Sequence, residues 1–299
     1  MIEVERVSKQ FGGLEALHDV SLAVHKGSIY GLVGCNGAGK TTLLKLLAGI
    51  YKPDSGLLMI DSQPVFENEA IKERTVFIPD ALYFFHNYSI QDMANYYASI
   101  YAGWSQQRFQ QLAQVFDIEL NRRVKTLSRG MQRQVAFWMG LSLMPEVMIL
   151  DEPLDGLDPV MRQNVKRLII QDVAERGMTV IISSHNLREL EDICDHIGIL
   201  HHGQMLIQKD LDDLKADIHK IQIAFSGEIP LALLDETEAL HHEQRGSVMI
   251  LIVRGAYDQI MNRMQAYQPA VLDVLPLTLE EIFIYEMGDN GYEIHNILY

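Results

Sequence analysis

The stretch GCNGAGKT, from Gly34 to Thr41, follows a short apolar run and has the pattern G-x-x-x-x-G-K-[ST]. Glycines allow the backbone to fold around a phosphate group, so that N–H groups and the start of the next helix face the anion. In this pattern Lys40 reaches the β- and γ-phosphates of a nucleotide, and the Thr41 hydroxyl can bind Mg²⁺. A glycine-rich turn with a chance lysine is the alternative, but the strand–loop–helix context favours a nucleotide site.

The apolar run VMILDE, residues 147–152, ends in two adjacent carboxylates. At the carboxyl end of a strand, Asp151 can hold Mg²⁺ through water while Glu152 leans toward the γ-phosphate. A strand that ends in a solvated acidic turn is the usual meaning of Asp-Glu-Pro by itself. Downstream of a phosphate-binding loop, the catalytic interpretation is favoured.

A third candidate is TLSRGMQRQ, residues 126–134, where an amphipathic helix is expected to begin at Ser128. The start of a helix presents unpaired N–H groups and the positive end of its dipole, and Gly130 permits close approach. These features suit an anion. Ordinary N-capping by Ser128 is the alternative that the isolated pattern would favour.

The elements that must position these residues alternate between strand and helix, which predicts an α/β fold with a mainly parallel sheet. Between about residues 80 and 145 the pattern changes to helices, which indicates an inserted helical subdomain. After about residue 215 two β-rich runs precede TLEEIFIYEM, where Thr278 and Glu281 have capping-box spacing. We therefore expect a domain over 1–215 and a small α+β extension over 216–299.

The composition limits the classes of function. The net charge of −15 disfavours long-range attraction to nucleic acid or anionic lipid. Two cysteines cannot form a disulfide framework and suit a reducing compartment. The acidic start and the lack of a long apolar run predict a cytoplasmic chain that does not itself cross a membrane.

The phosphate loop, LSRGM, VMILDE, DGLDP and ISSH occur in this order, and together they resemble the ATP-binding subunit of an ABC transporter over about residues 1–210. The resemblance implies a P-loop NTPase of the ABC type that hydrolyses ATP with Mg²⁺. It also implies that the helix beginning at Ser128 caps the γ-phosphate of ATP held by a second ATPase subunit, identical or different. Two subunits are then expected to dimerise around two ATP molecules.

Further roles follow from the resemblance. Phe11 is expected to stack on adenine, Asp158 to lie in the loop that crosses the dimer interface, and His185 to contact the γ-phosphate. The set expected to bind ATP is Phe11, Gly34, Asn36, Gly37, Ala38, Gly39, Lys40, Thr41, Thr42, Ser128, Gly130 and Asp158. The metal-binding set is Thr41, Asp80 and Asp151, and the catalytic pair is Glu152 and His185.

The chain departs from the family pattern in three places, of which one is Cys35, where the family commonly has proline or another small residue and to which we assign no chemistry. Asp80, in FIPD, stands where the family usually has Gln or Glu, so its reach toward Mg²⁺ is shorter. The segment LSRGM replaces LSGGQ, and together with PLTLEEIFIYEM it resembles the bacterial type-2 exporter branch. This branch implies a peripheral subunit on the inner face of the cell membrane that drives a separate permease, with export of a drug, peptide or lipid-like substrate.

The expected contact with the permease is the segment 84–114, with Tyr83, Phe84, Phe85 and Tyr88 as apolar anchors. Packing of these aromatic side chains in the core is an equally weighted alternative. A soluble ABC-type clamp acting on nucleic acid or ribosomes is the alternative function, and the charge of −15 weighs against it. A simple phosphotransferase would leave LSRGM and ISSH without a role.

Overall fold

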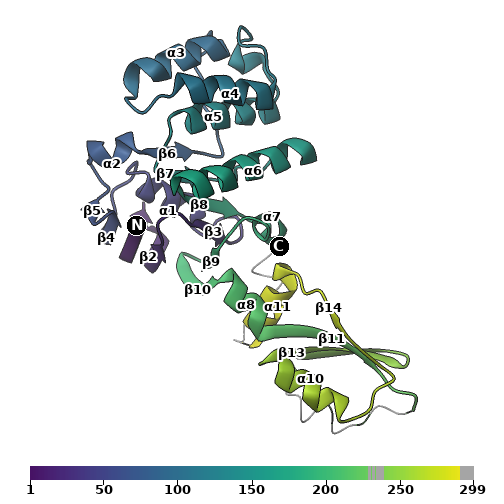
Figure 1. Ribbon diagram of the computed structural model, residues 1–299. Helices are drawn as coiled ribbons and strands as arrows, with labels where there is room; N and C mark the ends of the chain where they lie inside the picture. Colours follow the sequence, from purple (N-terminus) through teal and green to yellow (C-terminus); the bar gives the residue numbers. More distant parts are fainter. Residues whose placement is uncertain (228–229, 231–232, 234–238, 290–299) are drawn as a thin grey trace. The chain divides into compact units, whose positions relative to one another are not determined.

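The structure, a computed structural model of the chain, describes residues 1–227, 230, 233 and 239–289. The chain divides into two compact units, Met1–Gln208 and Lys209–Tyr299 (Figure 1). The expected C-terminal extension, residues 216–299, contains all the residues that lie outside the described part of the chain. None of the helices in the described ranges combines the length and the apolar character that crossing a bilayer requires.

The first unit contains a four-stranded antiparallel sheet in the order β2-β1-β4-β5. Alternate side chains of these strands enter the core, including Val4, Leu22 and Leu58, as expected for strands with one buried face. The bounds are β1 Ile2–Phe11, β2 Leu14–Val24, β4 Ser55–Ile60 and β5 Gln63–Pro64.

The same unit contains a six-stranded sheet in the order β10-β9-β3-β8-β7-β6. The pairs β3/β8, β3/β9, β7/β8 and β6/β7 are parallel, which confirms the predicted α/β fold. Strands β3, β7 and β8 are buried at every residue, as expected for central strands covered on both faces. The bounds are β3 Ile29–Val33, β6 Thr75–Ile78, β7 Val147–Leu150, β8 Thr179–Ser184, β9 His196–His201 and β10 Gln204–Asp210.

Helices follow the strands of this sheet. The side chain of Asp158 caps the longest of them by accepting from the N–H groups of Val160 and Met161, and Gly177 ends that helix with a φ of 67°. The side chain of Asn186 caps the short helix after β8. The bounds are α1 Lys40–Leu47, α2 Glu69–Glu73, α6 Pro159–Arg176 and α7 Leu187–Leu190.

Helices α3, α4 and α5 lie between β6 and β7 in the chain and pack together beside β6 (Figure 1). The indole of Trp138 stacks on Phe109 with ring centroids 4.9 Å apart and donates to the Phe109 carbonyl at 2.8 Å. This buried contact fixes α5 against α4. The bounds are α3 Ile90–Ile100, α4 Gln106–Phe116, the 3₁₀ turn η1 Val124–Thr126 and α5 Arg129–Ser142.

The second unit has an antiparallel sheet in the order β12-β13-β11-β14. Its core contains Ile223, Leu251 and Met264, and the predicted capping box at Thr278 and Glu281 is present. The bounds are α8 Leu211–Asp217, β11 Ile218–Ala224, β12 His241–Arg245, β13 Val248–Arg254, α10 Tyr257–Gln265, β14 Val271–Leu275 and α11 Leu279–Asp289.

Candidate functional site

The loop between β3 and α1 is held in a shape that requires glycine. A Cβ atom on Gly34 would lie 2.2 Å from the carbonyl oxygen of Leu200, and one on Gly39 would lie 2.6 Å from that of Ala16. Gly37 and Gly39 also have positive φ angles of 83° and 107°. The loop thus lies against the backbones of neighbouring segments, and its glycines serve both close approach and backbone conformation.

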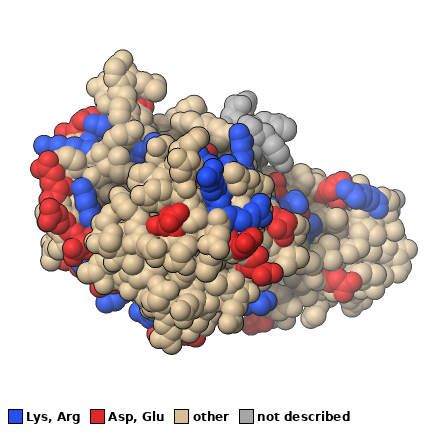
Figure 2. All heavy atoms as spheres, turned by 90° about the horizontal axis from the view of Figure 1, so that it is seen from above, with Lys and Arg blue, Asp and Glu red and all other residues tan. Residues whose placement is uncertain are grey.

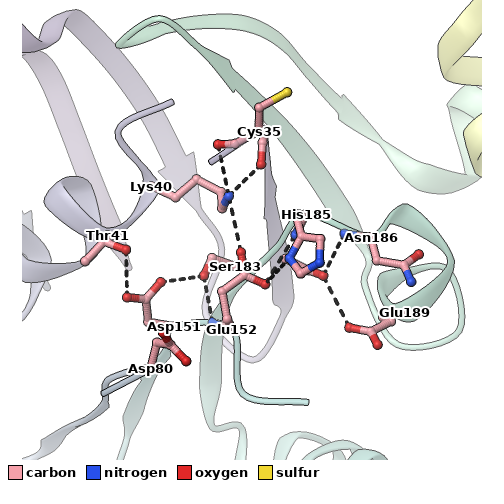
Figure 3. A network of polar contacts seen from close by, with 12 residues as sticks. Cys35, Lys40, Thr41, Asp80, Asp151, Glu152, Ser183, His185, Asn186 and Glu189 are labelled. Carbon is pink, nitrogen blue, oxygen red and sulfur yellow. Dashed lines mark hydrogen bonds and ion pairs between the residues drawn. The ribbon is translucent and has the colours of Figure 1, made fainter. Parts of the chain in front are cut away.

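The ammonium group of Lys40 lies inside this loop. It donates to the carbonyl oxygens of Gly34 at 2.5 Å and Cys35 at 3.3 Å, and it lies 3.2 Å from Glu152 Oε1 (Figure 3). The ion pair lacks the angles of a hydrogen bond, so buried Oε1 has no hydrogen-bond partner within the described residues. The site therefore contains a cation beside a carboxylate oxygen whose hydrogen-bonding capacity is unused.

A buried carboxylate lies next to the loop. Asp151 is 1% exposed, and its two oxygens accept hydrogen bonds from Thr41 Oγ1 and Ser183 Oγ, each at 2.8 Å. A threonine hydroxyl beside a carboxylate is the oxygen-donor set that Mg²⁺ prefers in phosphate sites. The residues present therefore fit a magnesium ion at Thr41 and Asp151.

Glu152 and His185 meet at the ends of β7 and β8. His185 Nδ1 lies 2.9 Å from Glu152 Oε2, and the backbone N–H of His185 donates to the same oxygen at 3.3 Å. The backbone N–H of Glu152 donates to Ser183 Oγ at 3.0 Å. Figure 3 shows the Glu152 side chain between Lys40 and His185. One carboxylate oxygen is thus held by the histidine and the other lies beside the lysine.

A cavity of about 380 Å³ lies at the phosphate loop, next to these residues. Nine of the sequence-predicted residues line it: Phe11, Asn36, Gly37, Gly39, Lys40, Thr41, Thr42, Asp80 and Glu152. The Phe11 ring meets the edge of Tyr51 at 5.2 Å between centroids. Gly34, Ala38, Asp151 and His185 are not among the lining residues, although they belong to the loop or contact lining residues.

Ser128, Gly130 and Asp158 do not line this cavity. Ser128 Oγ accepts from the N–H of Met131 at 3.2 Å and caps α5, while Asp158 caps α6. A Cβ atom on Gly130 would lie 2.5 Å from the carbonyl oxygen of Gly156, so the start of α5 lies against the loop before α6. Within one chain the phosphate loop and the start of α5 are separate surfaces.

Two contact residues escaped the sequence reasoning. Ser183 joins Asp151 to Glu152, and its position two residues before His185 on a buried strand was a usable signal. Arg133 donates to the carboxylate and carbonyl of Asp80 and to the carbonyl of Glu152. No local pattern indicated these contacts, because they join segments far apart in sequence.

Comparison with known proteins adds to this geometry. The family model described as "ABC transporter" matches residues 17–155. The chain is 32% identical over 288 residues to the ABC transporter ATP-binding protein YtrB of Bacillus subtilis (strain 168), covering 96% of this chain and 98% of that protein. It is 33% identical to the bacitracin transport ATP-binding protein BcrA of Bacillus licheniformis, covering 72% of this chain and 71% of that protein.

Solved structures show the same fold for most of the chain. The structure of an ATP-binding subunit of an ABC transporter superposes with a TM-score of 0.67 at 26% identity, covering 72% of this chain and 92% of the other. The structure of cbiO1 from Clostridium perfringens, part of the ABC transporter complex cbiONQ, gives a TM-score of 0.61 at 26% identity and covers 71% and 89%.

Proposed function

The chain belongs to the ABC transporter family as an ATP-binding protein and ATPase, and from this premise we propose that it hydrolyses Mg²⁺-ATP to drive a separate transmembrane permease. The observation that carries the proposal is the set of contacts joining Lys40, Asp151 and Glu152 beside the phosphate-loop cavity. A cation, a metal-binding carboxylate and a second carboxylate are the parts that phosphoryl transfer to water requires.

Thr41 and Asp151 would hold Mg²⁺, with Asp80 on the cavity wall as a further oxygen ligand through water. When bound, the ion would neutralise charge on the phosphate oxygens. Lys40 neutralises charge from the loop side, because its ammonium already points at the loop carbonyls. Gly39 offers α1 no side-chain cap, so the backbone N–H groups at the start of this helix would be suited to bind phosphate oxygens.

Glu152 is the proposed general base. Its Oε1 takes a proton from water while the water oxygen bonds to the γ-phosphorus and the bond to the bridging oxygen breaks, leaving its electron pair on ADP. His185 orients the carboxylate by holding Oε2. Phe11 would stack on the adenine, because this residue is 40% exposed and lines the cavity.

The proposed unit of activity is a dimer. The start of α5, with Ser128 and Gly130, lies outside the chain's own cavity, and its N–H groups are suited to an anion. A second ATPase subunit would supply this helix start, and the loop before Asp158 would lie at the interface. Two ATP molecules would then join two subunits, and hydrolysis would release them.

The proposed permease contact is an aromatic surface consisting of Tyr83, Phe85, Tyr88 and Tyr96. Tyr83 is 79% exposed, and Phe85 contacts the other three rings at centroid distances of 4.8 to 6.4 Å. Phe84, which the sequence also suggested as an anchor, is 6% exposed and packs inside. An exposed aromatic cluster of this kind suits an apolar partner segment.

The transported molecule is proposed to be a drug, peptide or lipid-like compound that is exported. The segment LSRGM and the C-terminal unit support this class by resemblance, and the relative BcrA is named for bacitracin transport. On the face drawn in Figure 2, a small group of basic side chains right of the centre is bordered by acidic ones, and both signs occur over the rest of this face. This distribution, like the net charge, gives little support to a nucleic-acid clamp.

The test is co-purification of the tagged chain from detergent-solubilised membranes. We expect a transmembrane chain to accompany the protein, and we expect Tyr83→Ser combined with Phe85→Ser to remove it without changing ATP binding. Leu57→Ser is the matched control, since Leu57 is also an exposed apolar residue, 56% exposed, outside the aromatic surface. Co-purified RNA or DNA without a membrane protein would contradict the proposal and support the clamp.

A further inference from the structure

Arg133 connects two segments at the ATPase site. It lies on α5, five residues after Ser128, and its side chain is only 9% exposed. Its Nη2 donates to Asp80 Oδ1 at 2.9 Å and to the Asp80 carbonyl at 3.0 Å, while Nη1 donates to the Glu152 carbonyl at 2.5 Å. One buried guanidinium thus holds the loop after β6 and the loop after β7 together.

The backbone of Glu152 has an unusual conformation that needs such support. Its φ is 46°, in the left-handed region that a residue with a side chain adopts at a cost. Its N–H is held by Ser183 Oγ at 3.0 Å, and its carbonyl accepts from Arg133 and, at 3.4 Å, from the N–H of Asp155. Side chains therefore bond to the polar groups on both sides of this Cα atom.

We propose that Arg133 is a positioning residue for hydrolysis, which acts by fixing the backbone of Glu152 and thereby the direction of its carboxylate. The inference rests on the proposed function, since it takes Glu152 as the general base. The planar guanidinium is required because its donors reach three acceptors in fixed directions, whereas a lysine ammonium provides one flexible point of contact. The Asp80 contacts hold the guanidinium in the orientation in which Nη1 meets the Glu152 carbonyl.

This arrangement has a mechanical consequence for α5. The helix start that the proposed dimer presents to the partner's nucleotide and the arginine that holds Glu152 lie little more than one turn apart. A displacement of α5 relative to β7 would therefore change the Arg133 contact and the orientation of Glu152 together. Arg133 would thereby couple closure of the proposed dimer to the orientation of the Glu152 carboxylate.

The first measurement is single-turnover hydrolysis by the purified full chain together with equilibrium binding of ATP. We expect Arg133→Ala to lower the rate of the hydrolytic step by about 100-fold, the size of loss that a small misplacement of a catalytic group produces. ATP affinity should stay unchanged, because Arg133 does not line the cavity. Arg133→Lys should restore only part of the rate, and a lysine variant with the full rate would overturn the inference.

The second measurement is a double-mutant cycle with Glu152→Gln. If Arg133 acts through Glu152, then Arg133→Ala should cause no further loss of the residual rate once the base is removed. Multiplication of the two losses, or a parallel loss of ATP affinity, would show that Arg133 merely supports the fold. Normal turnover of Glu152→Gln itself would instead reject the general base, and with it the proposed function.

Arg108→Ala is the matched control for removal of a buried arginine. Arg108 forms an ion pair with Asp172 at 2.6 Å, its side chain is 14% exposed, and it does not contact Asp80 or Glu152 in the described interactions. We expect this variant to lower the melting temperature and to keep the single-turnover rate. If Arg108→Ala slowed hydrolysis as much as Arg133→Ala, general loosening of the helices would explain both.

Discussion

Ser183 donates its hydroxyl hydrogen to Asp151 Oδ1 at 2.8 Å, which joins the carboxyl ends of β8 and β7 through two fully buried side chains. Ser183→Ala would leave this oxygen and the Glu152 N–H without their partner. We expect the free energy of unfolding to fall by roughly 1–3 kcal/mol, the usual cost of buried unsatisfied groups, and hydrolysis to slow. Urea unfolding of the nucleotide-free chain and steady-state ATPase assays measure the two effects.

Ser184→Ala is the control for this variant. Ser184 is buried on the same strand, and its hydroxyl bonds to Glu189 and to the N–H of Asn186 instead of to Asp151. The Ser184→Ala variant should also be less stable than the wild type, but its rate of ATP hydrolysis should fall less than that of Ser183→Ala. Equal loss of rate in both variants would contradict a specific role for the Ser183 hydroxyl.

Glu152→Gln should remove turnover and keep ATP binding, because the amide preserves shape but cannot accept the proton from water. Loss of a general base costs on the order of 10²–10⁴-fold in rate. The variant should accumulate as an ATP-bound dimer, which size-exclusion chromatography with ATP detects. Near-normal steady-state hydrolysis would show that another group activates the water.

Asp80 should affect the magnesium dependence of hydrolysis. Its Oδ1 already accepts from Arg133, but a carboxylate has about four lone-pair sites, so acceptors remain for metal-bound water. Asp80→Ala should raise the Mg²⁺ concentration for half-maximal activity, and Asp80→Glu should be tolerated. An alanine variant with the original Mg²⁺ dependence and intact coupling to the permease would mean that Asp80 serves only Arg133.

Mixed dimers test whether the start of α5 acts on the partner's nucleotide. Lys40→Ala damages the phosphate loop, and Ser128→Arg blocks close approach at the helix start. Each pure variant should be inactive, whereas a mixture should regain activity, because one site of the mixed dimer combines an intact phosphate loop with an intact helix start. ATPase activity on mixing, relative to the pure variants, is the measurement.

ATPase activity would not return on mixing if both sites of a dimer had to hydrolyse ATP together. It would not return either if the natural partner were a different chain. ATP-dependent crosslinking between cysteines placed at Asn36 and Ser128 therefore accompanies the mixing experiment. A crosslink between two chains supports the trans arrangement. A monomer, verified at high dilution, that hydrolyses ATP at an undiminished rate per chain would exclude it.

The second unit should lose part of its stability in acid through Glu281. Burial alone would raise the pKa of Glu281, but hydrogen bonds from Lys220 and Thr278 outweigh it, so this pKa lies below its ordinary value of 4.5. A lowered pKa in the folded state stabilises the fold above the ordinary pKa, and this contribution is lost as the pH falls through the lowered value.

Lys220→Met removes the main partner of Glu281, whose carboxylate lies 2.6 Å from the lysine ammonium. The variant should therefore unfold more readily than the wild type at neutral pH, and this difference in stability should shrink as the pH falls below the ordinary glutamate pKa of 4.5 and through the lowered pKa of Glu281. Hydrogen exchange of the β11 amides in the full chain follows this unit. A stability difference between Lys220→Met and the wild type that does not change with pH would show that the ionised Glu281 carboxylate is not its source.

Local patterns predicted the parts of the site that lie within one segment. The phosphate loop, the strand before Asp151 and the helix starts at Ser128 and Asp158 are each specified by neighbouring residues, and the structure has a strand, a loop or a cap at each position. The contacts between segments were not predictable in this way. Arg133 and Asp80, for example, are 53 residues apart, and no motif joined them.

The aromatic side chains after β6 show a second limit of sequence reasoning. Tyr83, Phe84 and Phe85 are adjacent and similarly apolar, yet Phe84 is 6% exposed while Tyr83 is 79% exposed. In a loop without regular periodicity, sequence spacing does not indicate which side chain points inward. Only the packing of the neighbouring helices decides this.

The contacts that shape the phosphate loop have a consequence for which mutations the protein can tolerate. The atoms nearest to a Cβ on Gly34 and on Gly39 would be the carbonyl oxygens of Leu200 and Ala16, which are main-chain atoms, while the side chains of Leu17 and Leu200 also lie against Gly39. Replacement of the Leu200 or Ala16 side chain would leave these two carbonyl oxygens in place and would change only the side-chain part of the wall. An insertion or deletion that slides β9 by one residue would shift the wall by about 3.3 Å. The main-chain part of the wall should therefore tolerate point substitutions in its supports better than single-residue changes in strand length, which would displace the carbonyl oxygens themselves.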